Sequence, residues 1–325
     1  MEGDELCFPQ LNTSCRKLKR SHFDTVCLLS IMSSISLLTA ALNLLVIISI
    51  SHFKQLHTPT NLLLLSLAVS DFFVGLLMIF QITLIEGCWY FSDLVCVIYS
   101  VLAIVIPSSS VGTMVLISVD RYAAICYPLH YPTKVTQRRV QICVSLCWIC
   151  SLFYVLLMIK ESLKQPGRFN SCTGECLIDF DFTKQFVDLI LSFFLPISVI
   201  IVLYLRVFVV AVSHARAMRS NITALTLQRS GKVTAKKSEL KAARTLGVVV
   251  LVFLTCFCPY FCVLLTSQDI LINPLSFIFV VCLFYFNSCL NPIIYAFFYP
   301  WFRKSMKVIV TLQILTPGSR NANVL

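Results

Sequence analysis

Long apolar runs alternate with short polar stretches along almost the whole chain. A helix needs about 20 mostly apolar residues to cross the hydrocarbon core of a bilayer. Segments of that kind lie near residues 25–51, 58–86, 94–127, 138–159, 183–214, 240–266 and 272–298. No segment resembles an earlier one closely enough to indicate the internal repeats of secondary transporters. The pattern therefore predicts an all-α membrane protein, a seven-transmembrane helix bundle.

The two ends of the chain are more polar than the spans. The polar residues 1–24 are predicted to form an extracellular N-terminal segment with no cleavable signal peptide. The first span is therefore expected to act as its own anchor. Residues 25–299 form the predicted seven-transmembrane domain, and residues 300–325 the predicted cytoplasmic tail. Within this tail, residues 300–310 suit a short amphipathic eighth helix on the inner leaflet.

Composition and charge fit a membrane protein and indicate its orientation. The chain is 58% hydrophobic and 13% charged, with a mean hydropathy of +0.86, whereas soluble domains are about half apolar and a quarter charged. Basic residues 16–20 alone would favour a cytosolic N-terminus, but those at 134–139 and 206–244 outweigh them. The net charge of +11 is thus mainly a topology signal and not evidence for nucleic-acid binding.

The polar residues do not suggest an enzyme. The five histidines lie at span ends, in loops or in the N-terminal segment, without the spacing of a metal site or catalytic triad. A transporter would need further charges along a path through the membrane. Asp120 and Arg121 do not supply such a path, because they lie at the cytosolic end of the third span.

The most specific pattern is the end of the last span, Asn287-Ser-Cys-Leu-Asn-Pro-Ile-Ile-Tyr-Ala-Phe-Phe-Tyr-Pro-Trp-Phe302. Amides and a proline in an apolar helix must face other protein or trapped water. With this motif the chain resembles the rhodopsin-like G-protein-coupled receptors. Residues in other spans match the same family, namely Asp71, Asp120-Arg121-Tyr122, Trp148, Pro196 and Pro259. The longer pattern NSxxNPxxYxxxYxWF resembles the fingerprint of the trace amine-associated receptors.

The resemblance implies an allosteric sodium site deep in the second span. Its residues would be Asp71, Ser110, Asn287, Ser288 and Asn291. The alternative is a buried acid that the same amides and hydroxyls satisfy without an ion. Oxygen ligands around a carboxylate are what a hard cation needs, which favours the ion.

The resemblance also implies a switch at the cytosolic face. An ion pair between Arg121 and Glu239 would hold the third and sixth spans together at rest, although a surface pair of this kind can contribute as little as about 0–1 kcal/mol. The further residues implied in switching and G-protein coupling are Asp120, Tyr122, Leu129, Tyr204 and Tyr295.

The ligand site departs from the aminergic pattern. Counting back from Arg121, Ala103 occupies the position of the amine-pairing aspartate of most aminergic receptors. Asp188 instead stands two turns before Pro196, which places it about 12 Å outward of that proline. This arrangement resembles a fish-type subset of trace amine receptors, so we expect Asp188 to pair with a protonated amine. The alternative is an ordinary i,i+4 ion pair with Lys184, but an acid inside a span favours function.

Aromatic residues are expected to complete this site. Tyr260, Phe261 and Tyr285 would offer ring faces to the cation. Phe257 replaces the tryptophan that usually acts as a rotamer switch, and Pro107 is unusual in the third span and should bend it. Both residues are therefore expected to shape the pocket.

Disulfides and one glycan are expected outside the membrane. The resemblance implies a Cys96–Cys176 bridge and a second bridge from Cys172 to either Cys7 or Cys15. Asn12 begins a glycosylation sequon, whereas the sequon at Asn221 falls in a cytosolic loop and is discounted.

The function implied by the resemblance is olfactory-type sensing at the plasma membrane. The receptor would bind a small volatile protonated amine and signal through a stimulatory G protein to raise cAMP. Because Ala103 is not an acid, we expect a monoamine. Two alternatives stay open: a receptor of the same fold for a neutral ligand, and a membrane transporter.

Overall fold

The structure, a computed structural model, is built from helices joined by loops. It describes residues 5–17, 21–85, 87–168, 170–178, 181–222, 247–248, 250–263 and 274–324. Among these residues, β-type backbone pairing is limited to two isolated bridges near the N-terminus.

Six helical runs within the described residues are long and apolar enough to cross a membrane. They are α1 (His22–His52), α2 (Pro59–Ile85), α3 (Asp93–Cys126), α5 (Gln137–Met158), the continuous run of α7 (Phe182–Asp188), η2 (Leu189–Phe194) and α8 (Leu195–Ile222), and α10 (Pro274–Phe298). A shorter apolar helix, Val250–Val263, lies where the sixth span is predicted. Residues 240–246, 249 and 264–266 of that predicted span lie outside the described residues.

Short polar side chains cap helices where the chain enters the bundle. Ser92 accepts a hydrogen bond from the Val95 N–H at the start of α3, at 3.4 Å. Asp181 accepts one from the Lys184 N–H at the start of α7, at 2.8 Å. These caps satisfy N–H groups that the first turn of a helix leaves without partners.

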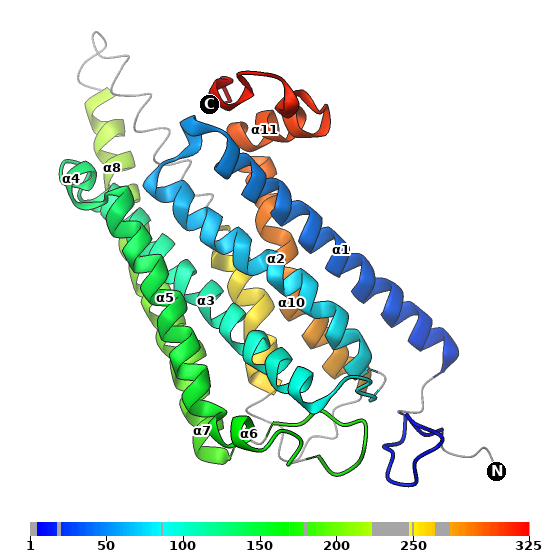
Figure 1. Ribbon diagram of the computed structural model, residues 1–325. Helices are drawn as coiled ribbons and strands as arrows, with labels where there is room; N and C mark the ends of the chain where they lie inside the picture. Colours follow the sequence, from blue (N-terminus) through cyan, green and yellow to red (C-terminus); the bar gives the residue numbers. More distant parts are fainter. Residues whose placement is uncertain are drawn as a thin grey trace.

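The first two helices pack closely because Gly75 has no side chain. A Cβ atom on Gly75 would lie 2.9 Å from the backbone nitrogen of Ala40 on α1. The Ser36 hydroxyl of α1 donates to the Gly75 carbonyl at 2.7 Å. Farther along the chain, α3 contacts α2, α5 and α8, while α10 contacts α1 and α2, so the helices close into one bundle (Figure 1).

The fifth span changes its helical geometry before Pro196. Its residues Leu189–Phe194 form a π-helical stretch in which the Leu195 N–H bonds to the Ile190 carbonyl. Proline has no N–H and crowds the carbonyl one turn earlier, and a wider turn accommodates both effects. This stretch begins directly after Asp188, so it governs where that side chain lies.

The two termini lie at opposite ends of the bundle (Figure 1). After α10, the predicted eighth helix is confirmed as α11 (Pro300–Val310), which buries Trp301 and Phe302 and exposes Arg303. The chain then returns toward the end of α1, where His52 Nε2 lies 3.0 Å from the Ser319 hydroxyl.

Candidate functional site

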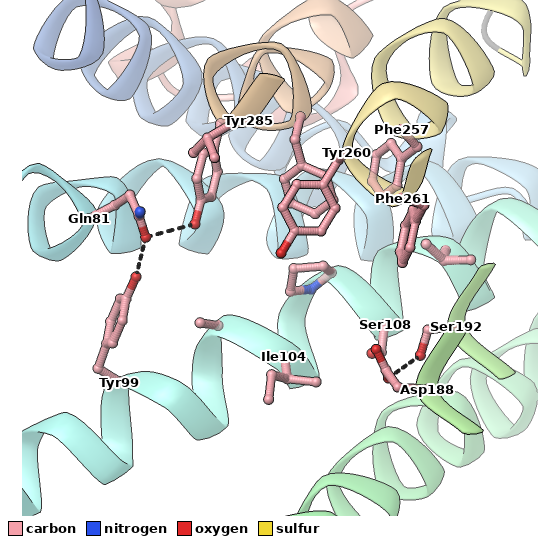
Figure 2. Close-up of a pocket in the computed structure, with 15 residues that line it drawn as sticks. Gln81, Tyr99, Ile104, Ser108, Asp188, Ser192, Phe257, Tyr260, Phe261 and Tyr285 are labelled. Carbon is pink, nitrogen blue, oxygen red and sulfur yellow. Dashed lines mark hydrogen bonds between the residues drawn. The ribbon is translucent and has the colours of Figure 1, made fainter. Parts of the chain in front are cut away.

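A cavity of about 280 Å³ lies among α2, α3, the end of α7, η2, the helix Val250–Val263 and α10 (Figure 2). Its lining includes every residue predicted for ligand binding, namely Ala103, Pro107, Asp188, Phe257, Tyr260, Phe261 and Tyr285. The other lining residues are Gln81, Tyr99, Ile104, Ser108, Val111, Ser192, Val281 and Phe284. This volume is slightly below the usual range of small-molecule pockets, so it suits a ligand of few atoms.

Asp188 is the one acid among the described residues that line the cavity. Its Oδ1 accepts hydrogen bonds from the Ser192 hydroxyl at 2.8 Å and from the Tyr154 hydroxyl of α5 at 3.0 Å. Its Oδ2 has no hydrogen-bond partner in the described part of the chain. Lys184 lies 3.9 Å from Asp181 instead, so the alternative Lys184–Asp188 pair is not formed.

Aromatic rings form the inner wall of the cavity. The ring centroids of Phe257 and Phe284 are 4.5 Å apart, and those of Tyr260 and Phe284 are 4.8 Å apart. Phe261 stacks on Phe193 at 4.3 Å. Because ring faces carry negative potential, this wall suits a cation with a hydrocarbon body.

The cavity has a second polar end on α2, α3 and α10. Gln81 Oε1 accepts a hydrogen bond from the Tyr99 hydroxyl at 2.6 Å and another from the Tyr285 hydroxyl at 3.4 Å. Figure 2 shows this cluster at the opposite end of the cavity from Asp188. Ala103 contributes only a methyl group to the lining.

The predicted sodium-site residues are buried in the middle of the bundle. Asp71 is fully buried, and Asn291 donates to its Oδ2 at 2.7 Å. Asp71 Oδ1 and the side-chain oxygen of Asn287 have no hydrogen-bond partner among the residues that the structure describes. Ser110 and Ser288 are also buried. Buried oxygens without partners are normally met by water or a cation, and an all-oxygen set around a carboxylate fits a sodium ion.

Arg121 is held at the cytosolic end of α3. Its Nε donates to Asp120 at 3.0 Å, and its terminal nitrogen contacts Asp120 and Thr60. The Tyr131 hydroxyl of α4 (Tyr131–Lys134) donates to Asp120 at 2.7 Å, and burial raises the pKa of Tyr131, which keeps this donor neutral. Glu239, the predicted partner of Arg121, lies outside the described residues.

The other predicted switch residues lie near the same end. Leu129 is 88% exposed, as an apolar group that contacts a cytosolic partner would be. Tyr295 is buried, and its hydroxyl has no partner within the described part of the chain, while Tyr122 is half-buried. Tyr204 lies directly against Gly247, where an added Cβ would overlap its hydroxyl.

Disulfides tie the loops together at the N-terminal end of the bundle. They join Cys96 to Cys176, Cys15 to Cys172 and Cys7 to Cys88. Between the two partners left open for Cys172, the structure therefore contains Cys15. Disulfides persist in oxidising compartments, which agrees with an extracellular N-terminus. Asn12 is exposed beside this region, and its glycosylation stays a prediction.

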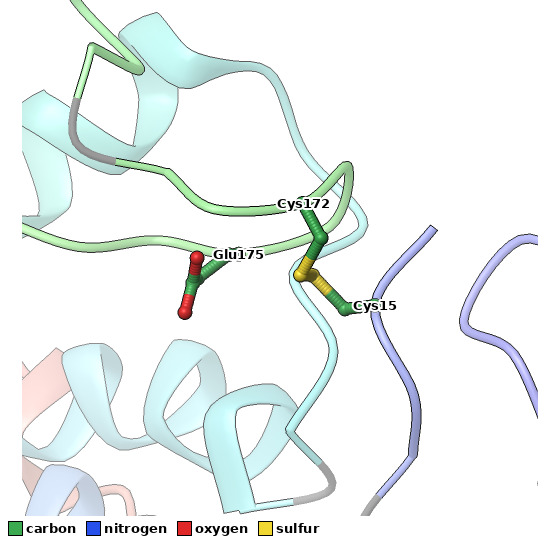
Figure 3. Close-up of side chains that lie close together, drawn as sticks. All are labelled: Cys15, Cys172 and Glu175. Atoms are coloured by element: carbon green, nitrogen blue, oxygen red, sulfur yellow. A yellow bond between two sulfur atoms is a disulfide. The ribbon is translucent and has the colours of Figure 1, made fainter. Parts of the chain in front are cut away.

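Glu175 lies close to the Cys15–Cys172 disulfide (Figure 3). A metal would need thiolates, and these two sulfurs are bonded to each other. Glu175 instead accepts a hydrogen bond from the Ser171 N–H at 2.6 Å. This group is therefore part of the loop structure and not a metal site.

Several residues at these sites were not anticipated from the sequence. They are Gln81, Cys88, Tyr99, Tyr154 and Ser192. The even number of cysteines expected outside the membrane, once Cys88 is counted, could have indicated its bridge. No local pattern marks Tyr154, because it reaches Asp188 at the end of α7 only through the packing of α5 beside the fifth span.

The apolar helices, the buried polar cluster at Asp71, the arginine at the end of α3 and the lined cavity together define a seven-transmembrane receptor. The family model described as 7 transmembrane receptor (rhodopsin family) matches residues 42–295. The fold predicted from the sequence is thereby confirmed.

Comparison with full-length relatives identifies the family of this receptor within the seven-transmembrane class. Trace amine-associated receptor 13c of Danio rerio is 38% identical, over 99% of this chain and 97% of its own length. Trace amine-associated receptor 4 of Mus musculus is 36% identical, over 98% and 95%. Trace amine-associated receptor 8b of Rattus norvegicus is 38% identical, over 98% and 96%. The chain belongs to the trace amine-associated receptors, which makes it a multi-pass plasma-membrane receptor and not an enzyme.

Proposed function

We propose that this receptor senses a small volatile protonated amine, in the manner of an olfactory receptor, and raises cAMP through a stimulatory G protein. The observation that carries the proposal is Asp188, the one acid in the described cavity lining. One of its carboxylate oxygens is hydrogen-bonded, and the other has no partner among the described residues. The names of the relatives support an amine as the ligand. The position of this acid on the fifth span supports our proposal that the receptor belongs to the fish-type subset.

Ligand binding would change the receptor through the side chains that the ligand contacts. The ammonium pairs with Asp188 Oδ2, and its carbon skeleton rests on Phe257 and Tyr260. Phe257 stacks on Phe253 at 4.3 Å, so a ligand that moves Phe257 acts on the packing deeper in the bundle. The amine needs only to favour one of two arrangements of these helices to shift their populations. Arg121 would then leave Asp120 and contact a G protein. Its new partner would be the Tyr295 hydroxyl, which is without a hydrogen bond to any described residue.

We also propose that Asp71 and its neighbours hold a sodium ion in the resting arrangement. The support is Asp71 Oδ1, which has no hydrogen-bond partner in the described ranges and lies beside buried amide and hydroxyl oxygens. A bound cation would balance the negative charge of the Asp71 carboxylate. Collapse of this cluster on activation would release the ion, so sodium is expected to oppose the agonist.

The test is a cAMP reporter response to a panel of volatile amines in cells that express the wild type or Asp188→Asn. The expected result is activation of the wild type by at least one amine and loss of that response in the variant at equal surface level. Asp181→Asn is the matched control, since asparagine also caps helices and Asp181 lies outside the cavity.

Two results would contradict the proposal. A response that survives in Asp188→Asn would make Asp188 structural. The absence of any amine response in surface-expressed wild type would favour a neutral ligand, the alternative that Ala103 supports.

A further inference from the structure

The polar cluster at the far end of the cavity takes no part in the proposed pairing of the ammonium with Asp188, although the sequence suggests Tyr285 as a ring facing the cation. It consists of Gln81 with Tyr99 and Tyr285, whose hydroxyls both donate to Gln81 Oε1. Figure 2 shows these three side chains together, with Asp188, Ser108 and Ser192 across the cavity. All three members of the cluster line the cavity, so a ligand that fills it meets them.

The cluster can still form hydrogen bonds in both directions. The amide nitrogen of Gln81 donates to none of the residues that the structure describes. Each tyrosine hydroxyl uses its proton on Gln81 and keeps lone pairs that can accept. A ligand group at this end therefore meets N–H donors and phenolic acceptors without a formal charge.

These partners favour an uncharged oxygen group. An ammonium at this end would lose its hydration without a carboxylate to pair with, since Asp188 is the one acid in the described lining. A plain alkyl end would displace water from Gln81 and leave its amide N–H without a partner. A hydroxyl or ether oxygen accepts from that N–H and avoids both costs.

The distance between the two ends sets the shape of the ligand. Tyr99 and Ser108 mark the ends on α3, and their nine-residue separation spans about 14 Å along the helix axis. Between them lie Ala103, Ile104 and Pro107, with aromatic rings opposite (Figure 2). A ligand that reaches both ends has a charged nitrogen, an apolar middle and a far oxygen.

We propose that Gln81, Tyr99 and Tyr285 form an oxygen-binding subsite, and that the preferred agonist is an amino alcohol or amino ether whose ammonium pairs with Asp188. This inference rests on the proposed amine function and adds the chemistry of the other end of the ligand.

The test compares α,ω-amino alcohols, n-alkylamines and α,ω-diamines of increasing chain length in cAMP dose–response curves. On the wild type, the best amino alcohol is expected to be about five- to tenfold more potent than the alkylamine of equal length, the effect of one or two hydrogen bonds. In Gln81→Leu this potency ratio falls to about one, because the donor is lost. Thr83→Val, on the same helix outside the cavity lining, is the matched control and keeps the ratio.

A gain-of-function variant tests the same contact independently of folding losses. Gln81→Glu is nearly isosteric and adds a carboxylate, so diamine potency is expected to rise about tenfold or more. Surface labelling confirms that the variant reaches the membrane. Tyr285→Phe removes only one hydroxyl, so it is expected to lower the ratio of amino alcohol to alkylamine potency less than Gln81→Leu does.

The outcomes separate this subsite from the amine function on which it rests. Amines that act through Asp188 with equal potency for amino alcohols and alkylamines overturn the subsite alone. A ratio that survives in Gln81→Leu, or a diamine response unchanged in surface-expressed Gln81→Glu, also overturns it. If no amine activates the wild type, the amine function and the subsite fail together.

Discussion

At the scale of single residues, the Asp188 carboxylate divides its two oxygens between protein and cavity. Tyr154 and Ser192 both donate to Oδ1, which orients the group, while Oδ2 has no partner among the described residues and is the atom we propose for the ligand. An acid inside a span is costly unless polar groups surround it. Two hydroxyls reduce that cost without neutralising the charge, so the carboxylate stays able to pair with an ammonium.

The hydroxyl of Tyr154 is therefore expected to matter for potency although it does not line the cavity. Tyr154→Phe removes one donor to Asp188 and should raise the EC50 of an activating amine about three- to tenfold. Ser151→Ala, on the same helix, is the control and should leave the EC50 near that of the wild type. Equal potency of Tyr154→Phe and wild type would show that the hydrogen bond does not position the acid.

Asp71 gives a second prediction at this scale. If a sodium ion occupies the cluster at rest, replacing KCl by NaCl at about 0.15 M should raise the EC50 of the amine in wild-type membranes. Asp71→Asn removes the charge that binds the ion and should abolish this sodium effect. A GTPγS-binding assay at constant ionic strength measures both. A sodium effect that persists in Asp71→Asn would place the ion elsewhere.

At the scale of helices, the bundle depends on close approach at a few small residues. Gly75 lets α2 lie against the backbone of α1, and Ser36 links the two helices by a hydrogen bond. Since α2 carries Asp71 and Gln81, this contact also determines where both sites lie relative to α1 and α10. The π-helical turn after Asp188 has the corresponding effect on the fifth span.

Gly75→Ala tests the contact between α1 and α2. The added methyl group meets backbone atoms that cannot move as a side chain does, so the receptor should lose about 1–3 kcal/mol of stability. The measurements are the surface fraction in cells and thermal inactivation in detergent. Leu37→Ala is the control, because Leu37 on α1 is 71% exposed and faces away from the other helices. A variant as stable as wild type would mean that the helices separate without cost.

At the scale of the whole molecule, the disulfides join the N-terminal segment to the loops at the mouth of the bundle. Cys7 bonds to the loop between α2 and α3, and Cys15 bonds to the loop after α6 (Lys160–Lys164). Two backbone hydrogen bonds reinforce the second connection: the Cys15 N–H donates to the Thr173 carbonyl, and the Thr173 N–H donates to the Thr13 carbonyl. The N-terminal segment is thus fixed to both loops.

This pairing predicts a pattern of non-additive losses. Cys7→Ser and Cys88→Ser should each cost about 2–4 kcal/mol, and the double variant should be no worse than either alone, since one bond is lost in all three. Cys7→Ser combined with Cys15→Ser breaks two bonds and should be clearly worse. Thermal inactivation of the purified receptor measures these losses. Additive losses for Cys7 and Cys88 would refute their bridge.

The sequence was sufficient to predict the helices and the position of Asp188 in the site. It was insufficient to predict the residues that hydrogen-bond to Asp188. Apolar length predicts a span wherever it occurs, and Asp188 could be placed at cavity depth by counting from Pro196 within one helix. The Tyr154–Asp188 contact joins α5 to the end of α7, and its geometry depends on how α5 packs beside the fifth span. The cluster at Gln81 likewise joins three helices. Such contacts have no local pattern, and neither does the choice between Cys7 and Cys15.

The most direct test of the account moves the charge from one helix to another. The measurement is the amine dose–response of Asp188→Asn and of the double variant Asp188→Asn/Ala103→Asp, both at wild-type surface level. The account predicts an EC50 raised about a hundredfold or more in Asp188→Asn, and at least partial recovery when Ala103→Asp returns a carboxylate to the same cavity. Wild-type potency in Asp188→Asn alone would contradict the account.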